Sequence, residues 1–324
     1  MIISKTPFRI SFCGGGTDLR EFYSHEPGAV TSTAIDKHMY ITVNQKFDDG
    51  IRVSYSKTEN VGKVDEIEHP LVREAMKVAG IMGGVEITSM ADIHSRGTGL
   101  GSSSSFIVGL LNALFAYKGE HKSAEFLARK ACEIEIDILK EPIGKQDQYI
   151  AAYGGFKHIA FNSDESVFVE PVICKPHVLK ELQKNLLLFY TGISQRSHEV
   201  LHDQRKKSHI NRNILLEMAE LARKLSGTLN NGDIGQFGTL LHQNWVLKKK
   251  LSDGVSNMVI DSYYEKALKA GAAGGKLLGA GGRGFLLLCC NQDRQQEVCA
   301  ALGNLRKVDF AFEPQGSRII YVGD

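Results

Sequence analysis

The 324-residue sequence contains no apolar segment of the roughly 18 to 20 residues that a membrane-spanning helix requires. Its first seven residues also lack the charged head and the apolar run of a secretory signal peptide. A membrane partner is therefore not expected, and the sequence predicts a cytoplasmic protein.

Cysteine pairs and metal-binding motifs are missing as well. The six cysteines include no Cys-x-x-Cys pair and mostly lie among apolar residues, so we expect reduced, buried thiols. The 11 histidines are scattered and form no His-Glu-x-x-His motif. A structural or catalytic zinc ion is accordingly not expected.

Neither sign of charge is in large excess. The 39 lysines and arginines nearly balance the 37 aspartates and glutamates, which leaves a formal net charge of +2. The short basic runs at residues 205–207 and 248–250 lie in helical patterns with polar neighbours, and we interpret them as solvated helix faces. The composition therefore predicts an ordinary globular protein and gives no argument for a nucleic-acid partner.

Glycine and serine, by contrast, are concentrated in one run that follows a strand-like segment at 84–89 and precedes a helical apolar pattern. The run is Gly97-Thr98-Gly99-Leu100-Gly101-Ser102-Ser103-Ser104-Ser105. Free N–H groups and the helix dipole attract anions at such a helix N-terminus. The run is therefore predicted to bind nucleotide phosphates, with a serine hydroxyl available to a bound Mg²⁺.

This run matches neither of two familiar nucleotide motifs. A P-loop needs a lysine after its last glycine, where this sequence has Ser102. The dinucleotide fingerprint needs an acidic residue that ends a second strand about 20 residues on, and Glu120 lies between two helical patterns instead. A loop that only turns the chain and caps the helix stays open as an alternative.

Hydrophobic periodicity predicts a mixed α/β layout with a domain junction near residues 175–185. Strands are expected at residues 2–13, 29–47, 51–56, 85–89, 156–161, 167–174, 186–190, 284–290, 308–313 and 318–322. Helices are expected at residues 71–78, 102–117, 123–139, 145–152, 197–225, 234–251, 256–270 and 294–302.

Near the N-terminus, Arg9 and Asp18 flank the three glycines at residues 14–16. The glycines allow a ligand to approach the backbone closely, and an aspartate after them can accept hydrogen bonds from the hydroxyls of a sugar. The arginine supplies a fixed positive charge beside a developing oxyanion. A hairpin turn with an Arg–Asp surface pair is the alternative interpretation.

Glu135 differs from its acidic neighbours in its place on a predicted helix. Glu133 and Asp137 belong to a solvent face, whereas Glu135 lies on an apolar stripe between Ala131 and Leu139. A carboxylate in such a place needs a partner. Mg²⁺ bound to nucleotide phosphates supplies one, and a buried ion pair is the alternative.

Asp147 follows a helix break at Pro142 and Gly144 and is a candidate base for a hydroxyl nucleophile. Lys145 is available nearby to hold this carboxylate in its ionised form. An exposed loop aspartate is the competing interpretation. A second glycine-rich segment, at residues 274–284, runs straight into an apolar strand, which indicates close backbone contact with another loop or a ligand.

Together these four segments resemble the GHMP kinase superfamily over almost the whole chain. Residues 99–103 resemble its phosphate loop, residues 275–284 its C-terminal glycine motif, and residues 6–18 its N-terminal substrate motif. The resemblance implies an α+β fold of two domains. We expect a ribosomal-protein-S5-like α/β domain at residues 1–180 and a ferredoxin-like α/β domain at residues 181–324.

The resemblance also implies roles for single residues in an ATP-dependent sugar kinase. Asp147 resembles the catalytic aspartate and Arg9 the arginine that activates the nucleophile, with Lys145 beside them, while Ser103 and Glu135 resemble the Mg²⁺ ligands. The residues expected to bind ATP are Gly97, Gly99, Leu100, Gly101, Ser102, Ser103 and Ser104. Those expected to bind the substrate are Gly15, Gly16, Thr17, Asp18, Gly281 and Gly282.

The fuller strings at residues 6–19 and 140–149 resemble the heptose 7-phosphate kinases of this superfamily. That resemblance implies transfer of phosphate from ATP to the anomeric hydroxyl of D-glycero-D-manno-heptose 7-phosphate, a small-molecule sugar phosphate, which gives the 1,7-bisphosphate. Lys37, Arg196 and Arg283 are candidates for binding the 7-phosphate, and the sequence does not choose among them.

Several alternatives stay open on the sequence alone. An L-fucokinase or another anomeric sugar kinase is the nearest, although fucokinase domains commonly belong to much longer chains. A non-catalytic sugar- or nucleotide-binding protein and a nicotinamide oxidoreductase are more distant alternatives. The sequence does not fix the oligomeric state, and a homodimer is one possible assembly.

Overall fold

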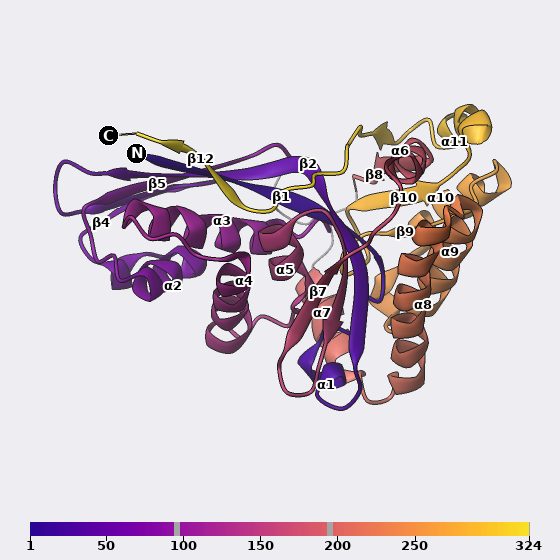
Figure 1. Cartoon of the computed structure of the whole chain (residues 1–324), viewed down its shortest axis with the longest axis horizontal. Coiled ribbons are helices and arrows are strands. Elements are labelled where there is room, and N and C mark those ends of the chain that lie inside the picture. The colour runs from indigo at the N-terminus through magenta and orange to yellow at the C-terminus, as the bar shows by residue number, and fades with distance from the viewer. Residues whose placement is uncertain (94–97, 193–196, 324) are drawn as a thin grey trace.

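The computed structural model describes residues 1–93, 98–192 and 197–323 (Figure 1). The strands are β1 (Ile2–Cys13), β2 (Gly28–Gln45), β3 (Ile51–Ser54), β4 (Thr58–Val61), β5 (Val85–Ala91), β6 (Phe156–Phe161), β7 (Val167–Pro171), β8 (Leu186–Tyr190), β9 (Gly274–Leu277), β10 (Phe285–Cys289), β11 (Arg306–Lys307) and β12 (Arg318–Val322). The helices are α1 (Arg20–Tyr23), α2 (Pro70–Ala79), α3 (Ser102–Tyr117), α4 (Ala124–Cys132), α5 (Gln146–Tyr153), α6 (Pro176–Lys184), α7 (Ser197–Lys206), α8 (Arg212–Asn231), α9 (Ile234–Lys249), α10 (Met258–Lys269) and α11 (Gln295–Ala301). Short helical turns are η1 (Val64–Glu66), η2 (Glu133–Ile138), η3 (Asp253–Val255) and η4 (Gln292–Arg294).

The larger sheet has the order β12-β1-β2-β5-β3-β4, with β6 and β7 as a branch from β2. The branch forms because β2 is long enough to take two partners on one side, β6 at residues 28–33 and β5 at residues 39–45. Helices α2 to α5 lie together beside this sheet (Figure 1). From Thr6 onward every residue of β1 is buried, because α3 and α5 from the first half and α8 and α9 from the second half all pack against it.

The smaller sheet has the order β11-β8-β10-β9 and is antiparallel throughout. Its strand β10 is an uninterrupted apolar run and is buried along its whole length, as expected for a strand covered by helices. Helix α9 packs against β9 and β10, and α8 packs against both α9 and β2. The long helix α8 therefore connects the smaller sheet to the larger one.

The last strand, β12, returns to the larger sheet and pairs antiparallel with β1. Ile2 lies opposite Val322, and the two chain ends lie side by side in Figure 1. The division of the chain into two domains between residues 180 and 181 stays a prediction. That division did not anticipate that residues 318–322 return to the sheet formed by the first part of the chain.

The predicted strand at residues 308–313 is wrong. The Val308 N–H donates to the Leu188 carbonyl of the smaller sheet, and the Glu313 N–H donates to the Ala34 carbonyl of the larger one. Since the segment crosses from one sheet to the other, its backbone groups have no single strand to pair with. The predicted helix at 197–225 is likewise two helices, α7 and α8, separated by a turn.

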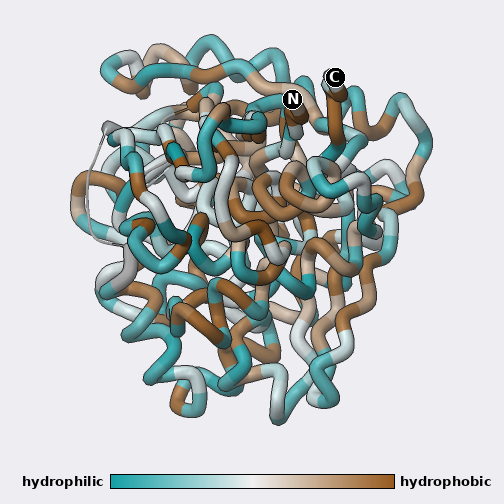
Figure 2. The backbone as a smooth tube through the Cα atoms, turned by 90° about the vertical axis from the view of Figure 1, so that its left-hand side faces the viewer, coloured by the Kyte–Doolittle hydropathy of each residue, from teal (hydrophilic) through white to brown (hydrophobic). Residues whose placement is uncertain are grey.

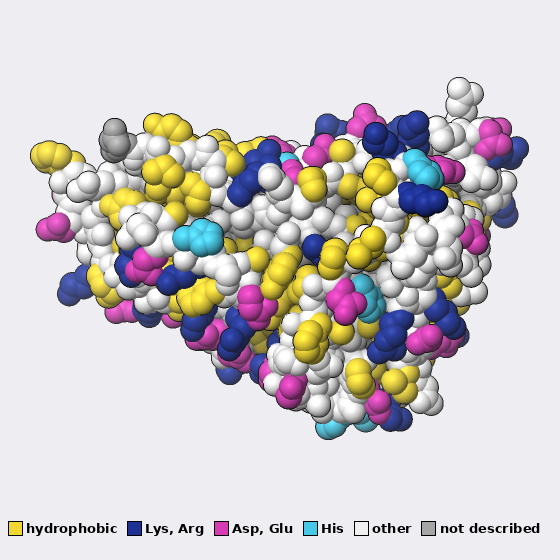
Figure 3. All heavy atoms as spheres, viewed as in Figure 1, with side chains coloured by type: hydrophobic (Ala, Val, Ile, Leu, Met, Phe, Trp, Pro, Cys, Tyr) yellow, Lys and Arg dark blue, Asp and Glu magenta, His cyan; other side chains and the backbone are white. Residues whose placement is uncertain are grey.

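No helix in the described ranges is long and apolar enough to cross a lipid bilayer. Hydrophobic and hydrophilic residues alternate closely along the backbone tube (Figure 2). On the face shown in Figure 3, positive and negative side chains are interspersed over both parts of the molecule.

Candidate active site

The glycine and serine run forms the turn between β5 and α3. Gly99 and Gly101 both have a φ of +74°, a left-handed conformation that glycine adopts without strain. Gly101 is the N-cap of α3, so the N–H groups of the first helical turn have no acceptor within the helix. Gly97 lies outside the described residues.

Most residues from Thr98 to Ser104 line a cleft of about 420 Å³, which we call the phosphate-loop cleft. Leu100 is the exception, because its side chain is buried in the core and its carbonyl accepts the N–H of Arg9 at 3.0 Å. It anchors the loop to β1. The loop thus presents N–H and hydroxyl groups to the cleft, which suits an anionic ligand.

Glu135 is fully buried in the π-helical turn η2, where the predicted helix at 123–139 changes its winding. Its carboxylate accepts hydrogen bonds from Ser103 Oγ at 2.6 Å, Ser104 Oγ at 2.8 Å and Gln148 Nε2 at 2.6 Å. Burial raises the pKa of the Glu135 carboxyl to about 7, although the three donors oppose the shift. Among the described residues, hydroxyl and amide groups of the loop and α5 therefore hold this carboxylate, and no cation pairs with it.

Asp147 lies in the first turn of α5 and pairs with Arg9. Arg9 Nε donates to Oδ1 at 2.7 Å and Nη2 donates to Oδ2 at 2.8 Å, and Nη1 donates to the Gly99 carbonyl. A charge-assisted pair of this kind fixes both groups in orientation as well as in charge. A Cβ at Gly101 would lie 3.1 Å from Arg9 Cγ and 3.2 Å from Asp147 Oδ2, which explains a glycine at the N-cap.

A smaller cavity of about 90 Å³, the inner cavity, adjoins the phosphate-loop cleft. The two spaces share lining residues, and these are Arg9, Ile143, Asp147, Leu201, Gly279 and Ala280. Asp147 therefore lies at the border between them.

Asp18 lines the inner cavity together with Gly15 and Gly16, and none of the three lines the phosphate-loop cleft. Its Oδ1 accepts the Gly16 N–H at 2.8 Å and its Oδ2 accepts the Gln146 N–H at 3.2 Å. Burial raises the pKa of the Asp18 carboxyl despite these hydrogen bonds. Thr17 is buried outside the cavity lining and holds the turn through hydrogen bonds to backbone groups.

Two lysines for which the sequence predicted no role line the same cavity. Lys248 Nζ donates to the Gly15 carbonyl and to Gln204 Oε1, each at 2.9 Å, and Lys276 Nζ donates to the Phe12 carbonyl at 3.0 Å. Burial lowers the pKa of Lys248 to about 8 and that of Lys276 to about 7.

The interpretation of residues 248–250 as a solvated helix face is therefore wrong for Lys248. Three consecutive helical residues point about 100° apart from one another, so a run of lysines near a packed helix end turns one of them inward. Lys276 carried a signal too, because it stands in a short strand of otherwise small and apolar residues.

Two further polar atoms of the inner cavity, Ser11 Oγ and Gln146 Oε1, are buried without a hydrogen-bond partner in the described part of the chain. A buried polar atom left unpaired costs free energy. Both atoms are therefore expected to bond a ligand in this cavity.

The second glycine-rich segment reaches the phosphate loop at Gly279. A Cβ on this residue would lie 2.5 Å from Gly99 Cα. Gly281 and Gly282, which were expected to bind the substrate, lie against Val255, whose carbonyl accepts the Gly282 N–H at 3.0 Å. Gly281 still lines the phosphate-loop cleft.

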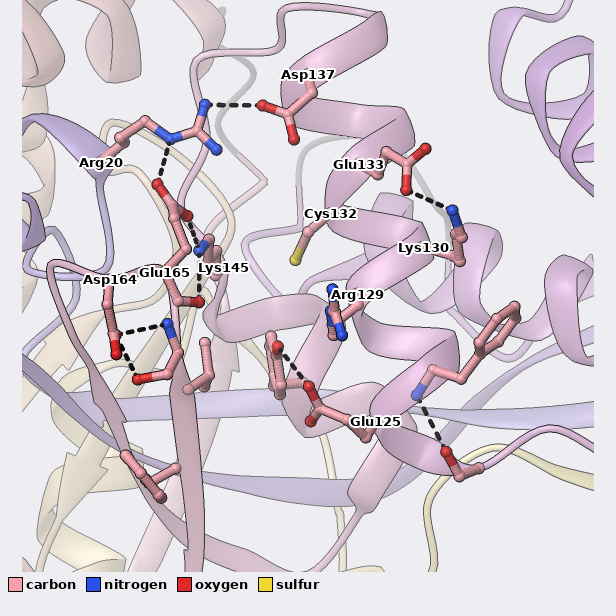
Figure 4. Close-up of a pocket in the computed structure, with 16 residues that line it drawn as sticks. Arg20, Glu125, Arg129, Lys130, Cys132, Glu133, Asp137, Lys145, Asp164 and Glu165 are labelled. Atoms are coloured by element: carbon pink, nitrogen blue, oxygen red, sulfur yellow. Dashed lines mark hydrogen bonds and ion pairs between the residues drawn. The ribbon is translucent and has the colours of Figure 1, made fainter.

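Lys145 does not join Asp147, so its expected role is wrong. Its ammonium group pairs with Glu165, and Nζ lies 4.5 Å from the centre of the Tyr23 ring. Figure 4 shows Lys145 and Glu165 in a separate cavity of about 1030 Å³, where Arg20 also binds Glu165. Neighbours on a turn that starts a helix point to different sides, and Arg9 is the cation that pairs with Asp147.

Ser103 and Glu135 offer a hydroxyl and a carboxylate on the wall of the phosphate-loop cleft. Within the described ranges, no three His, Cys, Asp or Glu side chains are grouped closely enough to hold a metal ion. Mg²⁺ takes oxygen ligands and is commonly held by one or two protein groups together with substrate phosphates and waters. The two residues fit an ion of that kind.

Family profiles match two parts of the chain. The profile of the GHMP kinases N-terminal domain matches residues 69–155, and that of the GHMP kinases C-terminal domain matches residues 218–306. The first range contains the phosphate loop, Glu135 and Asp147, and the second contains both cavity lysines.

Individual relatives extend over the whole chain. A D-glycero-alpha-D-manno-heptose 7-phosphate kinase of Campylobacter jejuni is 28% identical over 97% of each chain. A bifunctional fucokinase/GDP-fucose pyrophosphorylase of Arabidopsis thaliana is 26% identical over 91% of this chain but only 30% of its own length. The crystal structure of a D-glycero-D-manno-heptose 1-phosphate kinase from Bacteroides thetaiotaomicron is 25% identical, covers 100% of both chains and has a TM-score of 0.81. These similarities confirm the predicted α+β fold.

Proposed function

This chain belongs to the GHMP kinase family, and from that membership we propose that it is an ATP-dependent sugar kinase acting on D-glycero-D-manno-heptose 7-phosphate. The transfer joins the γ-phosphoryl group of ATP to the anomeric hydroxyl and gives the 1,7-bisphosphate. The Campylobacter jejuni relative, similar over nearly its full length, supports this substrate.

The observation that carries the proposal is the position of the Arg9–Asp147 pair. It stands at the border between a cleft lined by N–H and hydroxyl groups and a cavity lined by buried polar side chains. A phosphoryl donor in the cleft and a sugar hydroxyl in the cavity would therefore meet beside Asp147. Phosphoryl transfer depends mainly on such positioning and on charge stabilisation.

In the proposed reaction Asp147 accepts the proton of the anomeric hydroxyl as the oxygen attacks the γ-phosphorus. A bond forms between that oxygen and phosphorus, the bond to the β–γ bridging oxygen breaks, and ADP leaves. Arg9 stabilises the negative charge on the attacking oxygen and keeps the Asp147 carboxylate oriented towards it.

Ser103 and Glu135 would hold Mg²⁺, which when bound neutralises charge on the phosphates. The N–H groups at the N-terminus of α3 act on the same charge. Ser104 and Gln148 orient Glu135 through their hydrogen bonds, so its carboxylate is positioned before any ligand binds.

Asp18 is proposed to bind sugar hydroxyls in the inner cavity. Both of its oxygens already accept a backbone N–H, and each retains a further lone pair for a hydroxyl donor. Ser11 and Gln146 would complete the polar contacts to the sugar.

We also propose that residues 1–180 and 181–324 act as two domains that meet at the active site, with β12 of the second part completing the sheet of the first. The close approach of Gly99 and Gly279 supports this arrangement, because it joins the phosphate loop to the second glycine-rich segment. Leu201 on α7 and Lys248 on α9 bring the second part of the chain into the inner cavity.

L-Fucose is the second candidate substrate, since the Arabidopsis thaliana relative is in part a fucokinase. ADP release is measured with Mg·ATP and heptose 7-phosphate, L-fucose, galactose or no acceptor, each for the wild type and for Asp147→Asn. Turnover of the heptose phosphate that requires Asp147 supports the proposal. Turnover of fucose alone replaces the substrate, and a protein that binds ATP without turning over any acceptor contradicts the proposed chemistry.

A further inference from the structure

Two buried lysines, Lys248 and Lys276, line the inner cavity without a carboxylate partner among the described residues. Lys248 and Lys276 are 5% and 3% exposed, and both donate only to carbonyl and amide oxygens. Neither takes part in an ion pair in the described part of the structure. A buried cation is costly unless a negative charge accompanies it, so this arrangement calls for an anionic ligand.

The other charged or titratable groups that face these lysines do not supply the missing negative charge. Arg9 is positive and is already paired with Asp147. Asp18 is the one further carboxylate among the groups that act on them, and backbone N–H groups bind both of its oxygens. The Cys13 thiol is neutral, since burial raises its pKa to about 12. The cavity therefore has an excess of positive charge.

The lysines also lie where the part of the sugar farthest from the reacting hydroxyl is expected. Asp147, where the reacting hydroxyl is proposed to lie, is shared with the phosphate-loop cleft, whereas Lys248, Lys276 and Gln204 line the inner cavity alone. A substrate whose hydroxyl points to Asp147 extends from the border towards them.

We infer that Lys248 and Lys276 bind the phosphate group that the sugar substrate already carries, and that they select phosphorylated over free sugars. This inference rests on the proposed function. An ammonium group donates charge-assisted hydrogen bonds to phosphate oxygens, and a phosphate monoester carries nearly two negative charges at neutral pH.

The three basic residues considered from the sequence fit this role less well. Lys37 pairs with Asp36 and lines a different cavity of about 560 Å³. Arg283 lines the phosphate-loop cleft, where ATP is proposed to bind. Arg196 lies outside the described residues.

The test compares Lys248→Met and Lys276→Met with the wild type on two acceptors, D-glycero-D-manno-heptose 7-phosphate and the same heptose without phosphate. Each variant should raise KM for the phosphorylated sugar by at least about 30-fold, as expected when one partner of a buried charge pair is removed. For free heptose, kcat/KM should fall by at least about tenfold less than for the phosphorylated sugar, because only the phosphorylated sugar loses a charge-assisted contact. Lys249→Met is the matched control, since Lys249 lies on the same helix but pairs with Asp261 at 3.0 Å.

Thermal unfolding and KM for ATP verify that each variant is folded. An equal loss on both acceptors, or no loss on either, overturns the inference. A wild type that prefers free heptose also overturns it while the proposed sugar kinase function stands. If no sugar is turned over, calorimetric binding of heptose 7-phosphate without ATP decides: weakened binding by both Met variants supports the lysine site, and unchanged binding overturns it.

Discussion

Arg9 and Asp147 are joined by two hydrogen bonds although 138 positions separate them in the chain. The arginine comes from the buried part of β1 and the aspartate from the first turn of α5. Their pairing therefore depends on the packing of α5 against β1, and it places a fixed cation beside the proposed base.

Asp147→Asn keeps the shape of the side chain and removes its ability to accept a proton. We expect turnover to fall by about 100- to 10,000-fold, the usual effect of losing a general base, while KM for ATP changes little. Steady-state kinetics with heptose 7-phosphate test this, and thermal unfolding serves as the control for folding. Turnover within about tenfold of the wild type would rule out this role.

Glu135 makes the stability of the ligand-free protein depend on pH. Its pKa is about 7 in the fold against an ordinary value of 4.5, so between these values the folded protein keeps a proton that the unfolded chain releases. The free energy of unfolding is therefore highest below the ordinary pKa and decreases as pH rises through about 7, by up to about 3 kcal/mol from this residue.

Glu135→Gln removes that titration. Urea unfolding without Mg²⁺ should show the variant gaining stability relative to the wild type as pH rises from about 5 to about 8. A difference between the two proteins that does not change with pH contradicts the raised pKa. In activity assays the same variant should need more Mg²⁺ for half its maximal rate.

Gly99→Ala tests the contact between the phosphate loop and the second glycine-rich segment. A Cβ there would lie 2.3 Å from the Leu278 carbonyl oxygen, so the two segments must separate. Gly119→Ala is the matched control, because Gly119 has a similar φ of +77° and nothing within 4 Å of its added Cβ. The control should lose only the about 1–2 kcal/mol of a left-handed alanine, and Gly99→Ala should lose more and raise KM for ATP. Equal changes in melting temperature and in KM for ATP in the two variants would argue against the contact.

Ser11→Ala removes a buried hydroxyl that has no partner in the ligand-free protein. Its stability should change little, whereas KM for the sugar should rise by about 3- to 10-fold through loss of one hydrogen bond. Ser32→Ala, at the position paired with Ser11 in β2, removes a hydroxyl that donates to the Ile10 carbonyl at 2.8 Å. That control should lower the melting temperature and leave KM unchanged. The opposite pattern in the two variants would exclude Ser11 from sugar binding.

The two cavity lysines predict a pH dependence for substrate binding. Burial lowers their pKa values to about 7 for Lys276 and about 8 for Lys248, so both lose positive charge as pH rises through this range. KM for the phosphorylated sugar should therefore increase above about pH 7, and less steeply in Lys276→Met. Initial rates across this pH range measure the effect, with KM for ATP as the internal control. A KM for the sugar that is flat across the range contradicts the expectation.

Local patterns were sufficient for several parts of this structure. The bounds of α3 follow from a glycine turn and an apolar helix, and the burial of Glu135 follows from its apolar stripe. The lysine at residue 276 could not be placed in this way, because its bond to Phe12 joins residues 264 positions apart. The role predicted for Lys145 failed for the opposite reason. Lys145 is close to Asp147 in sequence, but in the fold it faces a different cavity.

The pairing of β12 with β1 has a consequence for biosynthesis. Residues 318–322 leave the ribosome after the whole smaller sheet, so the edge of β1 that they cover has no strand partner while the intervening chain is made. An open edge of this kind is a site for aggregation. Nascent chains halted before residue 318 should therefore be prone to aggregate and should bind chaperones. The sheet that begins to form first is thus completed last.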